Sequence, residues 1–182
     1  GVELSFNGYG DITKNIGINI LAGYTYMNTK SLEPNAIYYE NTYYAGSNGI
    51  IIDTITEYLT YSNSSSDTSV LKYRYKHIAK LDAELTYNKF SLGGSFRYND
   101  FMKNIDAAFV SPLLEGYIPD IVEARNQFIN GDFIVDLRSS YQINEIAKIS
   151  LIINNLLNRE YMSRPADMKP PRTIALQCNI KI

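Results

Sequence analysis

The chain has 182 residues and a formal net charge of −2, and its lysine and arginine residues form no basic stripe, so nucleic-acid binding is not expected. The single cysteine, Cys178, excludes an intramolecular disulfide and a cysteine zinc site, and the single histidine, His77, argues against a histidine metal cluster or a Ser-His-Asp triad. No long apolar run predicts a membrane helix, while the 16 tyrosines favour strands, membrane-interface girdles and recognition surfaces.

Seven segments alternate between apolar and polar residues, which predicts strands with one apolar face. In chain order they cover residues 2–12, 16–28, 73–87, 90–99, 132–142, 147–156 and 172–182. The last segment alternates most regularly, with Ile174, Leu176 and Cys178 on one face and Gln177 and Asn179 on the other. At roughly 3.3 Å per residue and a tilt of about 40°, this strand would rise about 28 Å, close to the apolar band of an outer-membrane barrel.

The connections between these segments alternate between short and long. Tight turns near Lys14, Asn88 and Asn144 alternate with long connections over residues 29–72, 101–131 and 157–171. Short turns at one end and long loops at the other are typical of outer-membrane barrels, in which the long loops are extracellular. The sequence therefore favours an all-β, antiparallel barrel over a soluble meander.

The long connections carry two further patterns. Residues 49–60 could form a short helix or another strand, and residues 120–128 have helix-like spacing after Pro119, which would suit a first-turn position. Tyrosines in the first connection could contact an extracellular ligand or partner, or pack over the barrel mouth. They are Tyr38, Tyr39, Tyr43, Tyr44, Tyr58 and Tyr61.

The third segment invites an enzymatic interpretation. Asp82 and Glu84 lie on one face about 7 Å apart, near the carboxylate spacing of glycosidases. No matching nucleophile or metal set accompanies them, so we interpret them as cross-strand partners of Arg and Lys side chains in a barrel lumen. His77 is expected near the outer rim and Cys178 on the lipid face. We predict no catalytic residue, no cofactor and no metal site, and therefore no enzyme.

The C-terminal residues resemble a known family. The stretches N-N-L-L-N-R-E-Y (154–161), R-P-A-D (164–167) and P-R-T-I-A-L-Q (171–177) resemble the C-terminal signature of TonB-dependent outer-membrane receptors. The pattern R-P-x-D-M-x-P-P-R-T over residues 164–173 is similar to receptors of Bacteroides-type bacteria. Residues 1–4 and 22–26 also resemble later strands of this family.

The resemblance implies a transmembrane β-barrel of about 22 strands, closed by a plug domain, in the outer membrane of a Gram-negative cell. Residues 1–182 would form its last seven strands with long extracellular loops, while the plug and the TonB-contacting segment would lie upstream. The implied partners are outer-membrane lipid, the plug, the remaining barrel strands and TonB. A surface lipoprotein is a further candidate partner.

The implied function is TonB-energised import of a bulky, scarce ligand such as a metal chelate, glycan or peptide. The alternatives are a passive outer-membrane pore or scaffold barrel, and a soluble carbohydrate-binding β-sandwich whose core would hold Leu81, Phe96, Leu137 and Leu176. In the barrel interpretation, polar side chains line the lumen and hydrogen-bond to plug and water. The candidates are Arg74, Lys76, Lys80, Asp82, Glu84, Arg97, Asp136, Arg138 and Lys181.

Overall fold

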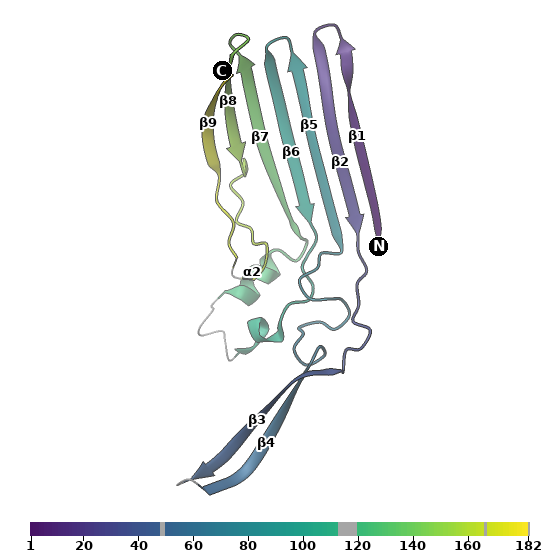
Figure 1. Ribbon diagram of the computed structural model, residues 1–182, viewed down its shortest axis with the longest axis vertical. Helices are drawn as coiled ribbons and strands as arrows, with labels where there is room; N and C mark the ends of the chain where they lie inside the picture. The colour runs from purple at the N-terminus through teal and green to yellow at the C-terminus, as the bar shows by residue number, and fades with distance from the viewer. Residues whose placement is uncertain (48–49, 113–119, 166, 182) are drawn as a thin grey trace. The chain divides into compact units, whose positions relative to one another are not determined.

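The computed structural model describes residues 1–47, 50–112, 120–165 and 167–181. The chain divides into two compact units, each with its own sheet (Figure 1). The first unit comprises Gly1–Met27, Tyr75–Phe101 and Gln127–Ile182, and the second comprises Asn28–Arg74 and Met102–Asn126.

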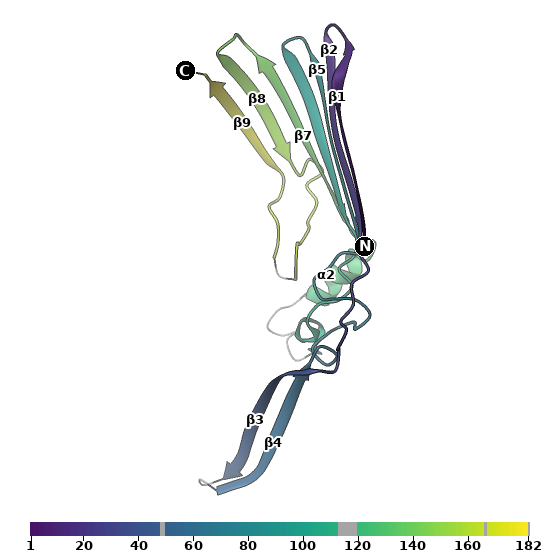
Figure 2. The ribbon, with the colours of Figure 1, turned by 45° about the vertical axis from the view of Figure 1, so that its right-hand side comes forward.

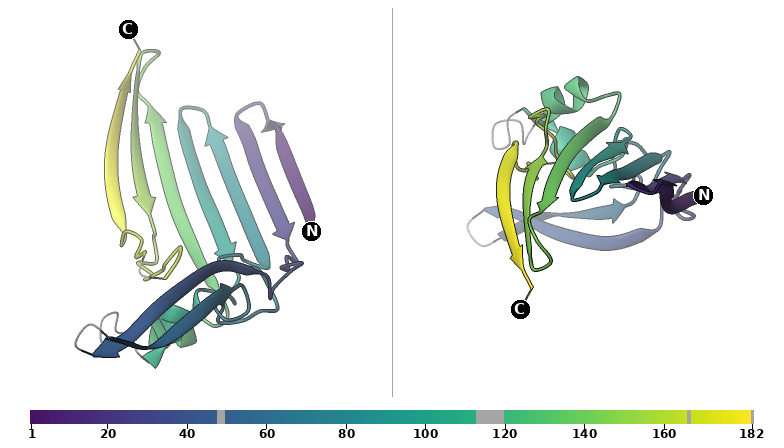
Figure 3. Two further views of the ribbon diagram at one scale, coloured as in Figure 1. Left: turned by 60° about the horizontal axis from the view of Figure 1, so that its bottom comes forward. Right: turned by 90° about the horizontal axis from the view of Figure 1, so that it is seen from above.

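The first unit is a single antiparallel sheet of seven strands in the order β1-β2-β5-β6-β7-β8-β9, visible side by side in Figures 2 and 3. The strands are β1 (Val2–Thr13), β2 (Ile16–Tyr26), β5 (His77–Tyr87), β6 (Phe90–Asn99), β7 (Asp132–Gln142), β8 (Ala147–Asn154) and β9 (Thr173–Ile180). All seven strands predicted from alternation are present, and β6 and β7 have the predicted bounds. The all-β antiparallel prediction is therefore confirmed.

Some strands are shorter than predicted, so three of the predicted site residues lie just outside the strands. Arg74 and Lys76 precede β5, which begins at His77, and Tyr73 before them has a left-handed conformation with φ of 58°. Lys181 follows the last residue of β9, although its amide still donates to the Ile146 carbonyl. These three cations therefore lie at the ends of the sheet, and their place in a lumen stays a prediction.

Short turns join three of the strand pairs, as predicted. In the β5–β6 turn, Asn88 adopts a left-handed conformation with φ of 52°, which asparagine tolerates better than most residues. In the β7–β8 turn, the Asn144 carboxamide oxygen accepts hydrogen bonds from the amides of Ile146 and Ala147 at 3.0 and 2.8 Å. Both asparagines thus fix tight turns locally.

One face of the seven-stranded sheet is apolar across its width, because the register aligns the apolar positions of neighbouring strands. Two such rows are Phe6, Ala22, Leu81, Phe96 and Val135, and Leu137, Ile153 and Ile174. The face is not a soluble core, since Leu81 is 44% and Leu176 is 73% exposed. The β-sandwich alternative requires both side chains to be buried, and neither is buried in the described sheet.

Aromatic rings lie in register near both ends of this apolar face. At one end Tyr24, Tyr98 and Phe133 share a row, and at the other end Tyr87 and Phe90 share a row with Tyr141. Positions 90 and 98 of β6 lie about 27 Å apart along the strand, or about 21 Å after a tilt of about 40°. This separation is close to the apolar band between the aromatic girdles of an outer-membrane barrel, roughly 25 Å tall.

The second unit contains a two-stranded antiparallel hairpin, a short 3₁₀ helix and a short α-helix. The elements are β3 (Ile37–Ser47), β4 (Ile50–Thr60), η1 (Ala107–Val110) and α2 (Ile121–Gln127). Residues 49–60, whose pattern was ambiguous between helix and strand, therefore lie largely in a strand. The helical spacing over 120–128 is confirmed by α2, whereas Pro119 lies outside the described residues. No helix among the described residues has the length and apolar character to span a bilayer.

Candidate functional site

A charged cluster lies on the polar face of the sheet, where three neighbouring strands meet. The register places Arg138 of β7 beside Gly93 of β6 and Gly93 beside Glu84 of β5. From β7, the Arg138 guanidinium reaches across β6 and donates to both Asp82 oxygens at 2.7 Å each. Its Nε also donates to Glu84 Oε2 at 2.9 Å. We call Arg138, Asp82 and Glu84 the arginine clamp.

Gly93 lets the Arg138 side chain of the clamp lie directly against the β6 backbone. A Cβ at this position would lie 2.7 Å from Arg138 Nε and 2.8 Å from Cζ, closer than real contacts allow. At its neighbour Gly94, which belongs to the apolar face, the nearest atom to such a Cβ would be 3.5 Å away, an ordinary contact. The glycine in β6 thus leaves the space through which an arginine from β7 reaches the carboxylates of β5.

A second ion pair lies beside the clamp. Arg97 of β6 donates to Asp136 Oδ2 of β7 at 3.1 Å, and the Ser95 hydroxyl donates to the same oxygen. The other oxygen, Asp136 Oδ1, accepts the amide of Asn155 at 2.8 Å. Both oxygens of Asp136 are therefore occupied, and the aspartate also fixes the chain at the end of β8.

The predicted polar-face residues have different roles in the structure. Asp82, Glu84 and Arg138 form the clamp, Arg97 and Asp136 form the second pair, and Lys80 makes no hydrogen bond or ion pair with any described residue. One arginine holds both carboxylates that suggested glycosidase chemistry, so neither stands free as an acid or base. The arrangement suits the wall of a polar interior. Whether that interior is a barrel lumen stays a prediction.

His77 lies at the end of β5 within the apolar face, near the rim as expected. It pairs in register with Tyr26, and its Nδ1 lies 2.7 Å from the Tyr24 hydroxyl. Lys76 Nζ lies 5.8 Å from the centre of the Tyr26 ring. Lys76 therefore contacts the aromatic residues at the strand ends and takes no part in the charged cluster of the polar face.

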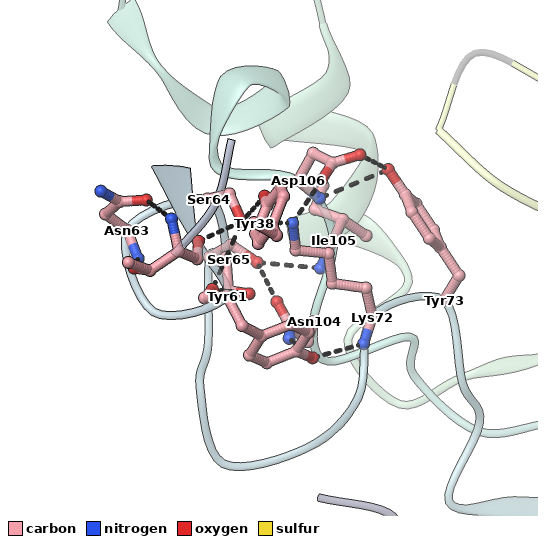
Figure 4. Close-up of polar contacts among 12 residues, drawn as sticks. Tyr38, Tyr61, Asn63, Ser64, Ser65, Lys72, Tyr73, Asn104, Ile105 and Asp106 are labelled. Carbon is pink, nitrogen blue, oxygen red and sulfur yellow. Dashed lines mark hydrogen bonds and ion pairs between the residues drawn. The ribbon is translucent and has the colours of Figure 1, made fainter. Parts of the chain in front are cut away.

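The second unit is organised around one buried amide. Asn104 is fully buried, and its Nδ2 donates to the Tyr61 hydroxyl at 2.8 Å (Figure 4). The same Nδ2 donates to the Val70 carbonyl at 2.7 Å. Its Oδ1 accepts the amide of Asp67 at 3.1 Å. These bonds join segments that are far apart in sequence, so Asn104 holds the loops of this unit together.

An ion pair flanks Asn104. Lys72 Nζ lies 2.6 Å from Asp106 Oδ1, and the Tyr73 hydroxyl donates to Asp106 Oδ2 (Figure 4). Burial raises the pKa of Asp106, but the hydrogen bonds and charge from these partners outweigh it and hold the pKa below its ordinary value. The aspartate is therefore ionised at neutral pH. Its contribution to stability is present above the ordinary carboxyl range and is lost as the pH falls through the lowered pKa.

The tyrosines proposed for extracellular contact divide into two groups. The Tyr61 hydroxyl donates to the Val70 carbonyl and accepts from Asn104 and from the Lys72 amide, so the Tyr61 hydroxyl is fully engaged in holding the loops. Tyr38 donates to Ser64 Oγ at 2.8 Å yet stays exposed. The other four are exposed on the hairpin: Tyr39, Tyr43, Tyr44 and Tyr58.

Sequence patterns did not single out three residues that organise these sites. In the sequence, Gly93 fits the alternation of its strand like any other residue. A Gly-Gly pair inside a strand can nevertheless mark a place where another group lies close to the backbone. Asn104 and Asp106 lie in a connection without periodicity. Their importance comes from partners more than 30 residues away, such as Val70 and Lys72.

Comparison with known proteins shows the fold. The chain matches no protein-family model, and no curated protein matches it. Among solved structures, it is similar to the siderophore receptor PiuA from Acinetobacter baumannii, with a TM-score of 0.59 and 19% identity over 98% of this chain and 21% of that chain. It is also similar to P. aeruginosa FpvA bound to a ferric pyoverdine, with a TM-score of 0.51 and 13% identity over 98% of this chain and 19% of that chain.

The sheet has the fold of a receptor barrel wall. The chain spans about a fifth of the length of the receptors it matches. Its antiparallel strands correspond to the barrel portion of TonB-dependent receptors.

Proposed function

We propose that residues 1–182 are the C-terminal part of the barrel of a TonB-dependent receptor that imports a bulky, scarce ligand across the outer membrane of a Gram-negative cell. The observation that carries the proposal is the two-sided sheet. One face is apolar between two aromatic rows, and the opposite face holds the ion pairs of Arg97 and Arg138. Such a sheet fits lipid on one side and a polar interior on the other.

The edges of the sheet support a barrel with more strands. Among the described residues, β1 pairs only with β2, and β9 pairs only with β8. In lipid an unpaired strand edge is too costly to persist, because no water satisfies its amide and carbonyl groups. Further strands and a plug domain, which would fill the polar interior, are therefore part of the proposal.

Ferric chelates are the first ligand class to test. PiuA is named a siderophore receptor and FpvA binds a ferric pyoverdine. The proposal extends iron chelates as a ligand class to this chain because of the shared fold. A glycan or a peptide remains an alternative ligand. A Bacteroides-type origin rests on the residues at 164–173 alone, whereas the matched receptors come from other bacteria.

Transport should depend on TonB. Uptake of radioactive iron, supplied as tris-catecholate and tris-hydroxamate complexes, is expected in cells that express the full-length protein and to be lost in otherwise identical cells without TonB. An oligosaccharide and an oligopeptide, tested in the same cells, would reveal the other ligand classes. Equal uptake with and without TonB would support a passive pore and overturn the import proposal.

The membrane placement predicts where a probe on β9 would lie. Cys178 pairs with Ile149 on the apolar face, and Gln177 pairs with Ser150 on the polar face. A fluorophore attached to Cys178 of the full-length protein in vesicles should be quenched strongly by spin-labelled phospholipids. The same fluorophore at Gln177→Cys, in a Cys178→Ser background, should be quenched weakly. Equal quenching at both positions would contradict a lipid-facing apolar face.

A further inference from the structure

One face of the β3–β4 hairpin is apolar and exposed. Two cross-strand pairs form it, Tyr39 with Leu59 and Tyr43 with Ile55. The side chains of Tyr39, Tyr43 and Ile55 are 54%, 49% and 50% exposed. An isolated two-stranded hairpin is marginally stable at best in water, and contiguous exposed apolar surface often marks an interaction site. This surface, which we call the tyrosine face, is therefore a candidate for contact with another molecule.

A carboxylate lies in the middle of the tyrosine face. Glu57 pairs in register with Asn41, between the two apolar pairs, which are four positions or about 13 Å apart along the strand. Glu57 is exposed and makes no hydrogen bond or ion pair with any described residue. A molecule that covers both apolar pairs also removes Glu57 from water. Because a desolvated carboxylate is costly unless it is paired and hydrogen-bonded, that molecule needs a cation opposite Glu57.

The sequence around the hairpin supplies no such cation. Residues 31–71 contain five carboxylates and no lysine, arginine or histidine. A second copy docked face to face would bring its own Glu57 against this one, and like charges at close range repel. An anionic chelate or an anionic lipid surface would be repelled for the same reason. Charge complementarity therefore selects a partner with a basic contact surface.

We propose that the tyrosine face docks a protein whose contact surface is apolar and places a lysine or arginine opposite Glu57. Tyrosine side chains provide large, rigid contact area at a low cost in conformational entropy, and tyrosine and arginine are enriched among the residues that dominate interface energetics. The two apolar pairs supply the buried contacts, and the charge pair at Glu57 fixes the orientation of the partner. The inference goes beyond the proposed function, because docking of this partner does not depend on which ligand is imported.

A photo-cross-linking residue tests which face docks the partner. p-Benzoylphenylalanine replaces either Tyr43 or Tyr44 of the full-length protein, expressed in the cells that naturally produce it. Tyr44 is the matched control, since it is 67% exposed and pairs with Thr54 on the opposite face of the hairpin. Irradiation should capture one protein about tenfold or more efficiently from position 43 than from position 44, because successive side chains of a strand point to opposite faces.

Mass spectrometry of the cross-linked peptide then identifies the occupant. A peptide of a different protein, with lysine or arginine beside the attachment point, is the expected result. Capture of a second copy, of another segment of the receptor or of a polysaccharide would overturn the proposal. Equal capture from both positions, or none from position 43, would do the same.

Charge reversal tests the cation opposite Glu57, with the identified partner purified and titrated against the full-length protein. Glu57→Lys should lower the affinity about tenfold or more, because it sets two cations against each other at the centre of the contact. Glu57→Gln keeps the side-chain shape and should also weaken binding. The matched control is Glu40→Lys, which changes an exposed carboxylate beside Tyr58 on the opposite face and should alter the affinity less than about twofold. Equal losses for Glu57→Lys and Glu40→Lys, or none for Glu57→Lys, would refute the pairing at Glu57.

Discussion

Replacing Arg138 with methionine should lower the free energy of unfolding of the full-length protein by about 2 kcal/mol. The change keeps much of the side-chain volume but leaves Asp82 and Glu84 close together without a cation. Removing one partner of a fully buried pair costs roughly 3–5 kcal/mol, and exposure reduces that figure. The side chains of Arg138, Asp82 and Glu84 are 36%, 38% and 31% exposed. Urea unfolding in detergent measures the effect.

Two controls separate the clamp from a general loss of packing. Adding Asp82→Asn and Glu84→Gln to Arg138→Met should recover most of the lost stability, since the repulsion between carboxylates disappears. Gly93→Ala should also destabilise, because its Cβ would meet the guanidinium at 2.7 Å, whereas Gly94→Ala should have little effect. Additive losses for Gly93→Ala and Arg138→Met would contradict the clamp, because residues that act together show coupling.

Replacing Asn104 with alanine should lower the free energy of unfolding of the second unit by about 2–3 kcal/mol. The substitution removes four side-chain hydrogen bonds at a fully buried position and leaves the Asp67 amide without its partner. Hydrogen exchange should therefore speed up at the amides of Asp67 and Lys72, the latter bonded to Tyr61. The amides of the seven-stranded sheet should keep their protection, since they belong to the other unit.

Asn63→Ala is the matched control within the same unit. Asn63 also makes side-chain hydrogen bonds, donating to the Tyr58 carbonyl and accepting the Thr60 amide, but it is exposed and water can replace these bonds. The Asn63→Ala substitution should lower the free energy of unfolding of the second unit by less than about 1 kcal/mol. An equal effect of the two substitutions would show that Asn104 is not the central residue of these loops.

The strands could be predicted because their pattern is local. Alternation in β6 and β7 gave their bounds, and asparagines with turn propensity marked the connections near Asn88 and Asn144. Where residue spacing was ambiguous, as over 49–60, local pattern could not decide between helix and strand. The pairing of β4 with β3 decided it, because hydrogen bonds to a neighbouring strand are a non-local property.

The sequence also predicted which residues share a face but not which of them would touch. Asp82, Glu84 and Arg138 were assigned to one polar face from alternation alone. That a single arginine would hold both carboxylates depended on the β5–β6–β7 register and on the absence of a side chain at Gly93. The same limit applies to Tyr61: composition left open whether it contacts a ligand or packs within the protein, and only the structure shows its hydrogen bonds with Asn104 and Val70.

The sequence by itself determined the alternating strands, the succession of short and long connections between them, and the apolar and polar face of each strand. Each of these features depends on residues only a few positions apart. The tertiary structure decided how seven strands align their faces into one sheet, where the aromatic rows fall, and that Arg138 holds both Asp82 and Glu84. These features depend on register between strands, which backbone hydrogen bonds and packing set together across distances that no local pattern records.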